Sequence, residues 1–417
     1  MIIKNRFLRG TLWTVAGTLG VVVLCCLTLL AINWRDRPPS AAALEMQRIF
    51  DATHPGAAHH NAAAASSAAA AAPAEQSGPM QALASACGNV GAECLRWLES
   101  NEKMIDTLLA SSGPLLDQYQ RTLRSGYSGD PYPYDARAWL GTNKDQTEGQ
   151  RLWLLLAWQL AASQDAQTIE DMLSQDLRFW RSVLQSCSYL SSKMIAAAQL
   201  KKHFLFGNLV LRRLPAGAAI SARPDHWSEA LSAEELSMAR VWAGEYDYVR
   251  LAIADIERSQ EQLDLEQLMA AQLFQSQDTS NQQAELFGNY ISIMDVPFAG
   301  FAAAYAKVQA ADQERQDNGI PLSPYNPVGN ILFTISAQSY APYIARVGDV
   351  EGIRRLAVLA DELRKRGLTK DQVATALRDS DIKAPFSGQP FDWDAAQGSI
   401  AFTGLAPAPR NRYSVIY

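Results

Sequence analysis

A few residues in this chain have types and spacings that could support catalysis. Asp392 and Asp394, in FDWDAAQG, would share one face of an extended segment, as a carboxylate pair for acid–base chemistry must. Ser100 and Lys103 fit S-x-x-K, but the S-D-N and K-T-G sequences that accompany this acyl-enzyme pattern are missing. A turn at Asp394 and a polar helix face at Ser100 are the simpler interpretations. We assign no catalytic residue to the chain.

The densest polar and aromatic segment spans residues 176–204. Its charged residues Asp176, Arg178, Arg181 and Lys193 are predicted to form ion pairs between helices. Such a network is more typical of structural support than of an active site.

Cysteines and histidines give one structural prediction and no metal site. Cys87 and Cys94 bound the short Gly-containing segment CGNVGAEC, which predicts a disulfide in an oxidising compartment. Cys187, in the apolar stretch SVLQSCSYL, is predicted to be a buried thiol. The histidines of residues 54–60 have no Cys, Asp or Glu at ligand spacing, so no metal and no cofactor are expected.

An apolar segment near the N-terminus predicts a membrane anchor. No charged residue occurs from Thr11 to Ile32, and a bilayer-spanning helix needs about 20 such residues. The run is longer than the apolar core of a signal peptide, and a cleavage site after Ser40–Ala43 is the weaker alternative. Basic residues precede the run, which predicts a cytoplasmic N-terminus (1–10) and an anchor at 11–34.

Two further regions follow the anchor. Residues 35–80 are rich in Ala, Pro and Ser and are predicted to be a flexible linker, with one or two helical turns at 43–54. Residues 81–383 show apolar spacing close to 3.6 and predict a helical domain outside the cytoplasm. Ser232 and Glu235 fit a capping box, and a helix–turn–helix is expected around Gly348.

The C-terminal region, 384–417, predicts a β-hairpin and a tail. Pro385 and Pro390 oppose helix formation, Gly388 fits a turn, and Phe391 and Trp393 are expected to pack in the hairpin. The fold class is therefore mainly α: a transmembrane helix, an Ala-rich linker and an irregular array of helical hairpins that ends in a small β-hairpin.

Two blocks, at residues 176–200 and 325–364, resemble segments of uncharacterised, membrane-anchored helical proteins of the Gram-negative periplasm. Those proteins also end in a P-F/Y-S/T-G-x-P-aromatic-x-W/Y block, matched here by Pro385, Gly388, Pro390, Phe391 and Trp393. The resemblance implies an envelope protein with a helical periplasmic body and brings no known activity.

Charge and topology narrow the function that is expected. The net charge is −6, and the N-terminal segment is basic, so the body is acidic and nucleic acid is not an expected partner. We expect a single-pass inner-membrane protein that contacts the bilayer through its N-terminal helix. Its periplasmic domain is expected to be a non-enzymatic scaffold that binds a protein partner in an envelope assembly. The alternatives are an immunity protein against a periplasm-acting toxin and an envelope hydrolase.

Overall fold

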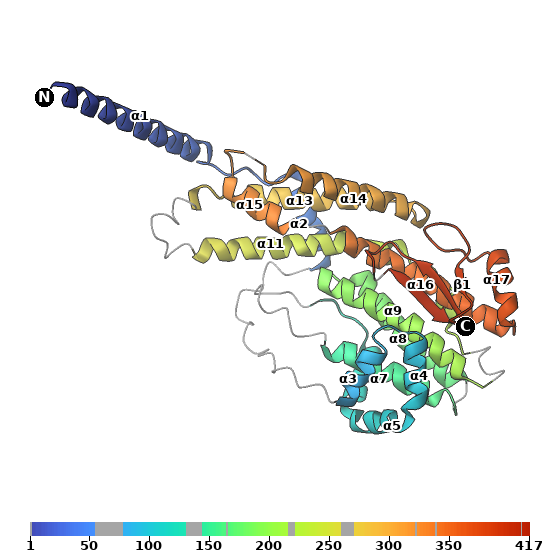
Figure 1. Ribbon diagram of the computed structural model, residues 1–417. Helices are drawn as coiled ribbons and strands as arrows, with labels where there is room; N and C mark the ends of the chain where they lie inside the picture. Colours follow the sequence, from blue (N-terminus) through green and yellow to red (C-terminus); the bar gives the residue numbers. More distant parts are fainter. Residues whose placement is uncertain are drawn as a thin grey trace. The chain divides into compact units, whose positions relative to one another are not determined.

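The computed structural model is mainly helical, as the sequence predicts, and ends in a small antiparallel sheet (Figure 1). It describes residues 2–54, 78–130, 144–163, 166–215, 222–259, 271–321, 323–337, 340–409 and 411–417. His59 and His60 lie outside the described residues.

Helix α1 (Ile2–Ile32) contains the predicted anchor. Its segment Trp13–Ile32 has a mean hydropathy of 2.6, and none of it is buried within the protein. Among the described residues this is the one unbroken helix that is long and apolar enough to cross a membrane.

The chain forms two compact units. The first comprises residues 1–48, 246–289 and 310–339, and the second comprises residues 49–245, 290–309 and 340–417. Four of the five boundaries fall within helices, namely α2 (Ala41–Thr53), α11 (Ala239–Ser259), α13 (Ser276–Met294) and α14 (Phe301–Asn318), and the fifth lies just before α16. Helix α15 (Pro327–Ser336) belongs wholly to the first unit.

In the first unit, the residues that follow the anchor are held by side-chain hydrogen bonds. The Asn33 amide donates to the Pro324 carbonyl (2.8 Å), and its oxygen accepts from the backbone N–H of Asn326 (2.7 Å). The Gln275 side chain donates to the Asn33 carbonyl at 2.8 Å. Both Asn33 and Asn326 are buried. The end of α1 is therefore fixed to a loop almost 300 residues later in the chain.

Asp36 ties the segment that follows α1 to helix α13, and we call this segment and its partners the junction. Its carboxylate accepts from the backbone N–H groups of Gln277 (2.6 Å) and Asp278 (3.0 Å), in the first turn of the helix. These donors have no partner within their own helix, so Asp36 acts as a cap supplied from a distant segment. Arg37 also pairs with Asp278, at 3.0 Å.

Residues 41–53 form a longer helix than the one or two turns predicted at 43–54. Helix α2 covers Ala41–Thr53 and buries Ala43, Met46 and Phe50 on one side. These apolar residues recur at helical spacing, so they share one face of the helix. Residues 55–77, the rest of the low-complexity segment, lie outside the described residues.

The second unit contains most of the packed helices. Helices α8, α9 and α16 make its most extensive helix–helix contacts. The bounds of its helices are α3 (Gly78–Ala86), α4 (Ala92–Ser100), α5 (Glu102–Ser111), α6 (Gly113–Ser125), α7 (Lys144–Leu160), α8 (Ala166–Ser186), α9 (Leu190–Arg213), α10 (Ala233–Leu236), α16 (Ala341–Lys365) and α17 (Lys370–Asp379). Short 3₁₀ turns lie at Asp225–Trp227 and Phe298–Gly300. The Ser232–Glu235 capping box at α10 is confirmed.

Helix α16 corrects the helix–turn–helix expected at Gly348. It runs unbroken from Ala341 to Lys365. A Cβ at Gly348 would lie 2.4 Å from the Phe301 ring, and one at Gly352 would lie 2.4 Å from the Phe402 ring. These glycines therefore allow aromatic side chains to approach the helix closely, and they do not form a turn.

The C-terminal region forms one strand more than predicted. Strands β1 (Asp392–Asp394), β2 (Ser399–Thr403) and β3 (Arg412–Ile416) lie in the order β1-β2-β3, with antiparallel pairing throughout. Trp393 pairs with Ile400, and Ile400 pairs with Val415. The expected hairpin is therefore confirmed, and the expected tail supplies the third strand.

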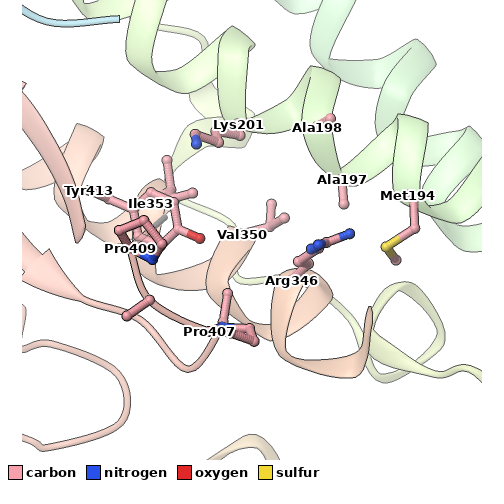
Figure 2. A pocket seen from close by; sticks show the side chains of 12 residues that line it. Met194, Ala197, Ala198, Lys201, Arg346, Val350, Ile353, Pro407, Pro409 and Tyr413 are labelled. Atoms are coloured by element: carbon pink, nitrogen blue, oxygen red, sulfur yellow. The ribbon is translucent and has the colours of Figure 1, made fainter. Parts of the chain in front are cut away.

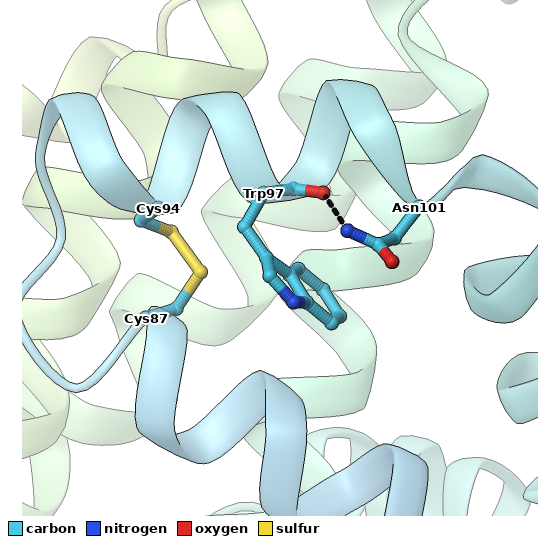
Figure 3. Close-up of a disulfide and its surroundings, with 4 residues drawn as sticks. All are labelled: Cys87, Cys94, Trp97 and Asn101. Atoms are coloured by element: carbon cyan, nitrogen blue, oxygen red, sulfur yellow. Dashed lines mark hydrogen bonds between the residues drawn. A yellow bond between two sulfur atoms is a disulfide. The ribbon is translucent and has the colours of Figure 1, made fainter.

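The predicted disulfide is present at the start of the second unit. Cys87 follows α3, Cys94 lies in α4, and the two sulfur atoms are 2.06 Å apart (Figure 3). In the same helix the Asn101 side chain donates to the Trp97 carbonyl at 2.8 Å. The link joins two short helices that have little core of their own.

Loss of this disulfide should destabilise the second unit. Closing so short a loop is worth about 2.5 kcal/mol by chain entropy. We expect Cys87→Ser to lower the free energy of unfolding by that amount, measured by urea denaturation of the full chain in detergent micelles. Dithiothreitol should lower the wild-type value equally and leave the variant unchanged. Insensitivity of the wild type to dithiothreitol would contradict the bond.

Candidate functional site

A buried polar cluster joins helices α6, α7, α8 and α9. The Asp176 carboxylate accepts from the Tyr119 hydroxyl (2.5 Å), the Gln150 amide (3.0 Å) and His203 Nδ1 (2.7 Å). His203 Nε2 accepts from the Trp227 indole N–H at 2.8 Å. Burial, together with the adjacent Asp176 charge, raises the pKa of the Tyr119 hydroxyl well above its usual value.

The Asp176–His203 pair has the connectivity of a catalytic dyad but no access to a substrate. Both side chains have 0% exposure, and the Trp227 indole occupies the nitrogen that would act as a base. Every polar atom of the imidazole is satisfied within the protein. We interpret the cluster as a structural network that fixes the packing of four helices.

Of the other three charged residues predicted to form ion pairs between helices, only Arg181 does so among the described residues. Arg181 binds Glu235 through two contacts of 2.6 and 2.7 Å, which confirms one ion pair between elements. Arg178 donates to the Ser174 carbonyl in its own helix. Lys193 donates to two backbone carbonyls, and burial lowers its pKa to about 8.

Cys187 is a buried thiol, as predicted. Its side chain is almost fully buried, and this burial raises its pKa to about 12, although the nearby Lys193 charge acts in the opposite direction. A thiol with so high a pKa is a poor nucleophile at neutral pH.

Within the described part of the chain, a cleft of about 530 Å³ in the second unit offers a concave site for a ligand (Figure 2). Apolar side chains of α9 and α16 form its floor, and the C-terminal loop forms one wall. Its lining residues are Met194, Ala197, Ala198, Lys201, Arg346, Val350, Ile353, Ala406, Pro407, Ala408, Pro409 and Tyr413. The members from α9 and α16 recur every three or four residues, so each helix presents one face to the cleft.

Two cationic side chains enter this cleft from different helices (Figure 2). Lys201 lies 4.8 Å from the centre of the Tyr413 ring, and Arg346 lies 5.4 Å from the centre of the Tyr343 ring. Arg346 is exposed, and within the described part of the chain it forms no ion pair with a carboxylate. A planar guanidinium in this position is suited to bind a carboxylate through two hydrogen bonds.

Asp349 on α16 holds the wall of the cleft in place. Its carboxylate accepts from the backbone N–H groups of Leu405 (2.7 Å) and Ala406 (3.1 Å) and from the Tyr413 hydroxyl (2.8 Å). Burial raises the pKa of Asp349, and these donors and the Lys201 charge act against that rise. A Cβ at Gly404 would lie 2.4 Å from an Asp349 oxygen, so only glycine admits the carboxylate here.

The conspicuous C-terminal block supports the cleft and does not line it. Phe391 is buried against Phe402, with ring centres 5.8 Å apart, and Trp393 is half-buried against Tyr417. Pro385 lies close to Gly352 on α16, and Gly388 has a φ of 66°, as its predicted turn requires. Pro390 directly precedes Phe391 at the entry to the sheet.

The aspartates of this block have structural partners instead of catalytic ones. Asp392 pairs with Arg412 at 3.1 Å, and Asp394 accepts from the backbone N–H of Gln397 in the turn before β2. Ser100 and Lys103 lie at the junction of α4 and α5. Among the described residues, no group of three or more His, Cys, Asp and Glu side chains could hold a metal ion.

Comparison of the chain with protein-family models, curated proteins and solved structures finds no match. The resemblance to membrane-anchored periplasmic proteins therefore stays a prediction, and functional inference rests on the geometry of the cleft.

Removing the Asp349 carboxylate should loosen the C-terminal wall. Asp349→Ala leaves two backbone N–H groups and the Tyr413 hydroxyl without their acceptor, at a cost of about 2–4 kcal/mol. We expect that loss in urea denaturation of the full chain, followed by tryptophan fluorescence. Asp381→Ala, at an exposed position, is the matched control and should unfold like the wild type. Equal midpoints for Asp349→Ala and the control would show that the tie is not stabilising.

Proposed function

We propose that this chain is a single-pass inner-membrane protein whose periplasmic body binds an acidic segment of a partner protein. Its role would be that of a non-enzymatic scaffold in an envelope assembly. The single observation that carries the proposal is the cleft between α9, α16 and the C-terminal loop, where Lys201 and Arg346 stand over an apolar floor.

The size and chemistry of the cleft favour a short segment over a small polar metabolite. A volume of about 530 Å³ accommodates several side chains, and sites of this kind combine an apolar lining with a few convergent polar groups. Arg346 would bind a carboxylate of the partner, while Met194 and Ala198, which are accessible in the cleft, would contact its apolar residues. Asp349 is already bound to the wall and offsets part of the Lys201 charge, so Arg346 dominates recognition.

Membrane insertion and orientation are parts of the same proposal. The anchor segment Trp13–Ile32 has the length and hydropathy of a span, and the basic residues before it favour a cytoplasmic N-terminus. The Cys87–Cys94 disulfide supports an oxidising location for the second unit.

The alternatives differ from this proposal in observable ways. An immunity protein would use the same cleft but bind a toxin, so the identity of the partner separates the two roles. A hydrolase would need an accessible base, whereas the Asp–His pair found among the described residues is sealed by Trp227.

The proposal can be tested by site-specific crosslinking in intact cells. A benzophenone amino acid replaces Ala198, an exposed residue of α9 that lines the cleft. We expect one discrete protein adduct, detected by immunoblot and identified by mass spectrometry. Arg346→Glu should abolish that adduct, because the reversed charge would repel the acidic segment.

Arg121→Glu, an exposed charge reversal on α6 outside the cleft, is the matched control and should retain the adduct. An adduct that forms equally in Arg346→Glu, or no adduct at all in the unmodified background, would contradict the proposed binding mode.

A further inference from the structure

Helix α15 exposes an apolar side and buries a polar one, the reverse of a helix that packs on a water-soluble body. Three of its exposed side chains are large and apolar: Ile331 is 42% exposed, Leu332 is 38% exposed and Ile335 is 62% exposed. Val328, one turn earlier, is half-exposed on the same side. These residues recur at i, i+3, i+4 and i+7 and form a continuous apolar stripe.

The buried side of α15 is small and polar. Asn330 is buried, where it accepts from the Gln282 amide at 2.8 Å and donates to the Tyr325 carbonyl at 3.1 Å. Gly329 packs so closely that a Cβ would lie 2.2 Å from Thr279 Oγ1. The polar face of α15 is thus satisfied inside the first unit, and its apolar face is left outside.

The start of α15 is tied to the end of the membrane anchor. Asn326 caps the helix, since its side chain accepts from the Gly329 N–H at 3.1 Å, and its own N–H donates to Asn33. Asn33 directly follows the apolar segment that ends at Ile32, and Trp34 next to it is 78% exposed. Trp residues favour the membrane–water interface, so this junction marks the bilayer surface.

The sequence around α15 is also free of charge. No Asp, Glu, Lys or Arg occurs between Asp317 and Arg346, although the rest of the body is rich in them. Apolar side chains at an interface gain from insertion among lipids, and nearby charges would oppose that insertion.

We propose that α15 is a second membrane contact, an interfacial helix whose Ile331, Leu332 and Ile335 side chains enter the outer leaflet beside the anchor. The proposal rests on the membrane insertion of α1 given above. It commits to the lipid bilayer as the occupant of this face, because the cap of α15 is hydrogen-bonded to the residue at which the anchor leaves the membrane. The first unit would then be held against the membrane at two points.

Lipid-borne quenching tests this contact in the full-length protein. In a Cys25→Ala, Cys26→Ala background, single cysteines at Ile335, Val22 and Glu314 are labelled with an environment-sensitive NBD fluorophore. Cys187 is buried, and Cys87 is paired with Cys94, so these cysteines stay unlabelled. The protein is reconstituted in phosphatidylethanolamine–phosphatidylglycerol vesicles that contain lipids with a nitroxide on the upper acyl chain.

The label at Val22 reports on the anchor, and the label at Glu314, an exposed residue of α14 in the same unit, reports on the aqueous surface. We expect quenching at Ile335 comparable to that at Val22 and none at Glu314. Leu332→Cys provides a second reporter on α15, and circular dichroism verifies the helix content of each labelled protein.

Two outcomes would overturn the proposal, and they are distinguishable. Quenching at Val22 with none at Ile335 and Leu332 would show an inserted anchor and an α15 that lies off the membrane. Blue-shifted but unquenched emission at Ile335 would place a second copy of the chain on this face. Absence of quenching at Val22 would refute membrane insertion itself, and the contact of α15 would fall with it.

Discussion

The hydrogen bonds that fix the end of the anchor helix are the constraint on which the first unit depends. Asn33 and Asp36 lie within a few residues of the span, yet their partners are on α13 and in the loop before α15. Each bond satisfies a backbone group that would otherwise be buried or unpaired at a helix end. Without them, the backbone N–H groups at the α13 N-terminus and at the α15 cap would lose their acceptors.

Around α15, this arrangement places polar side chains inside the first unit and apolar side chains outside it. The buried Asn326 side chain donates to the buried Asp278 carboxylate, and buried Asn330 accepts from the Gln282 amide. The isoleucines of α15 are exposed. In water such a distribution would be costly, because exposed apolar area is not removed from solvent. It becomes favourable beside a bilayer, which is the environment that the anchor would provide.

The second unit uses buried polar groups for a different purpose. Asp176 joins four helices through Tyr119, Gln150 and His203, and Asp349 joins α16 to the C-terminal loop. Each carboxylate is buried but has several donors, which offsets the loss of hydration. The cleft exists because Asp349 fixes the loop at a distance from α9, leaving Lys201 and Arg346 facing the space between them.

Local signals in the sequence predicted much of the architecture. Helical periodicity, the capping box at Ser232 and the short loop between Cys87 and Cys94 depend on neighbouring residues, and the structure contains all three. The functional groups depend on contacts across long stretches of chain, which spacing does not reveal. Gly348 looked like a turn because glycine serves both turns and close packing, and only the position of Phe301 separates the two uses.

The cleft and the junction escaped prediction for the same reason. Lys201 and Arg346 are separated by well over a hundred residues and match no motif, and Asn33 was assigned to the predicted anchor at 11–34. Its partners Pro324 and Asn326 lie almost 300 residues later in the chain, and no local pattern connects them to Asn33. The apolar residues of α15 can be read from the sequence, but their exposure depends on the tertiary structure.

Hydrogen exchange at the start of α13 tests the central claim, that the rest of the first unit is fixed directly to the end of the anchor helix. The N–H groups of Gln277 and Asp278 have no acceptor within their own helix, so their protection reports the Asp36 carboxylate itself. In the full chain reconstituted in nanodiscs, both amides should exchange slowly, and Asp36→Ala should accelerate them while amides within α9 stay unchanged. Exchange of both amides in the wild type at the rate of an unstructured peptide would contradict the account.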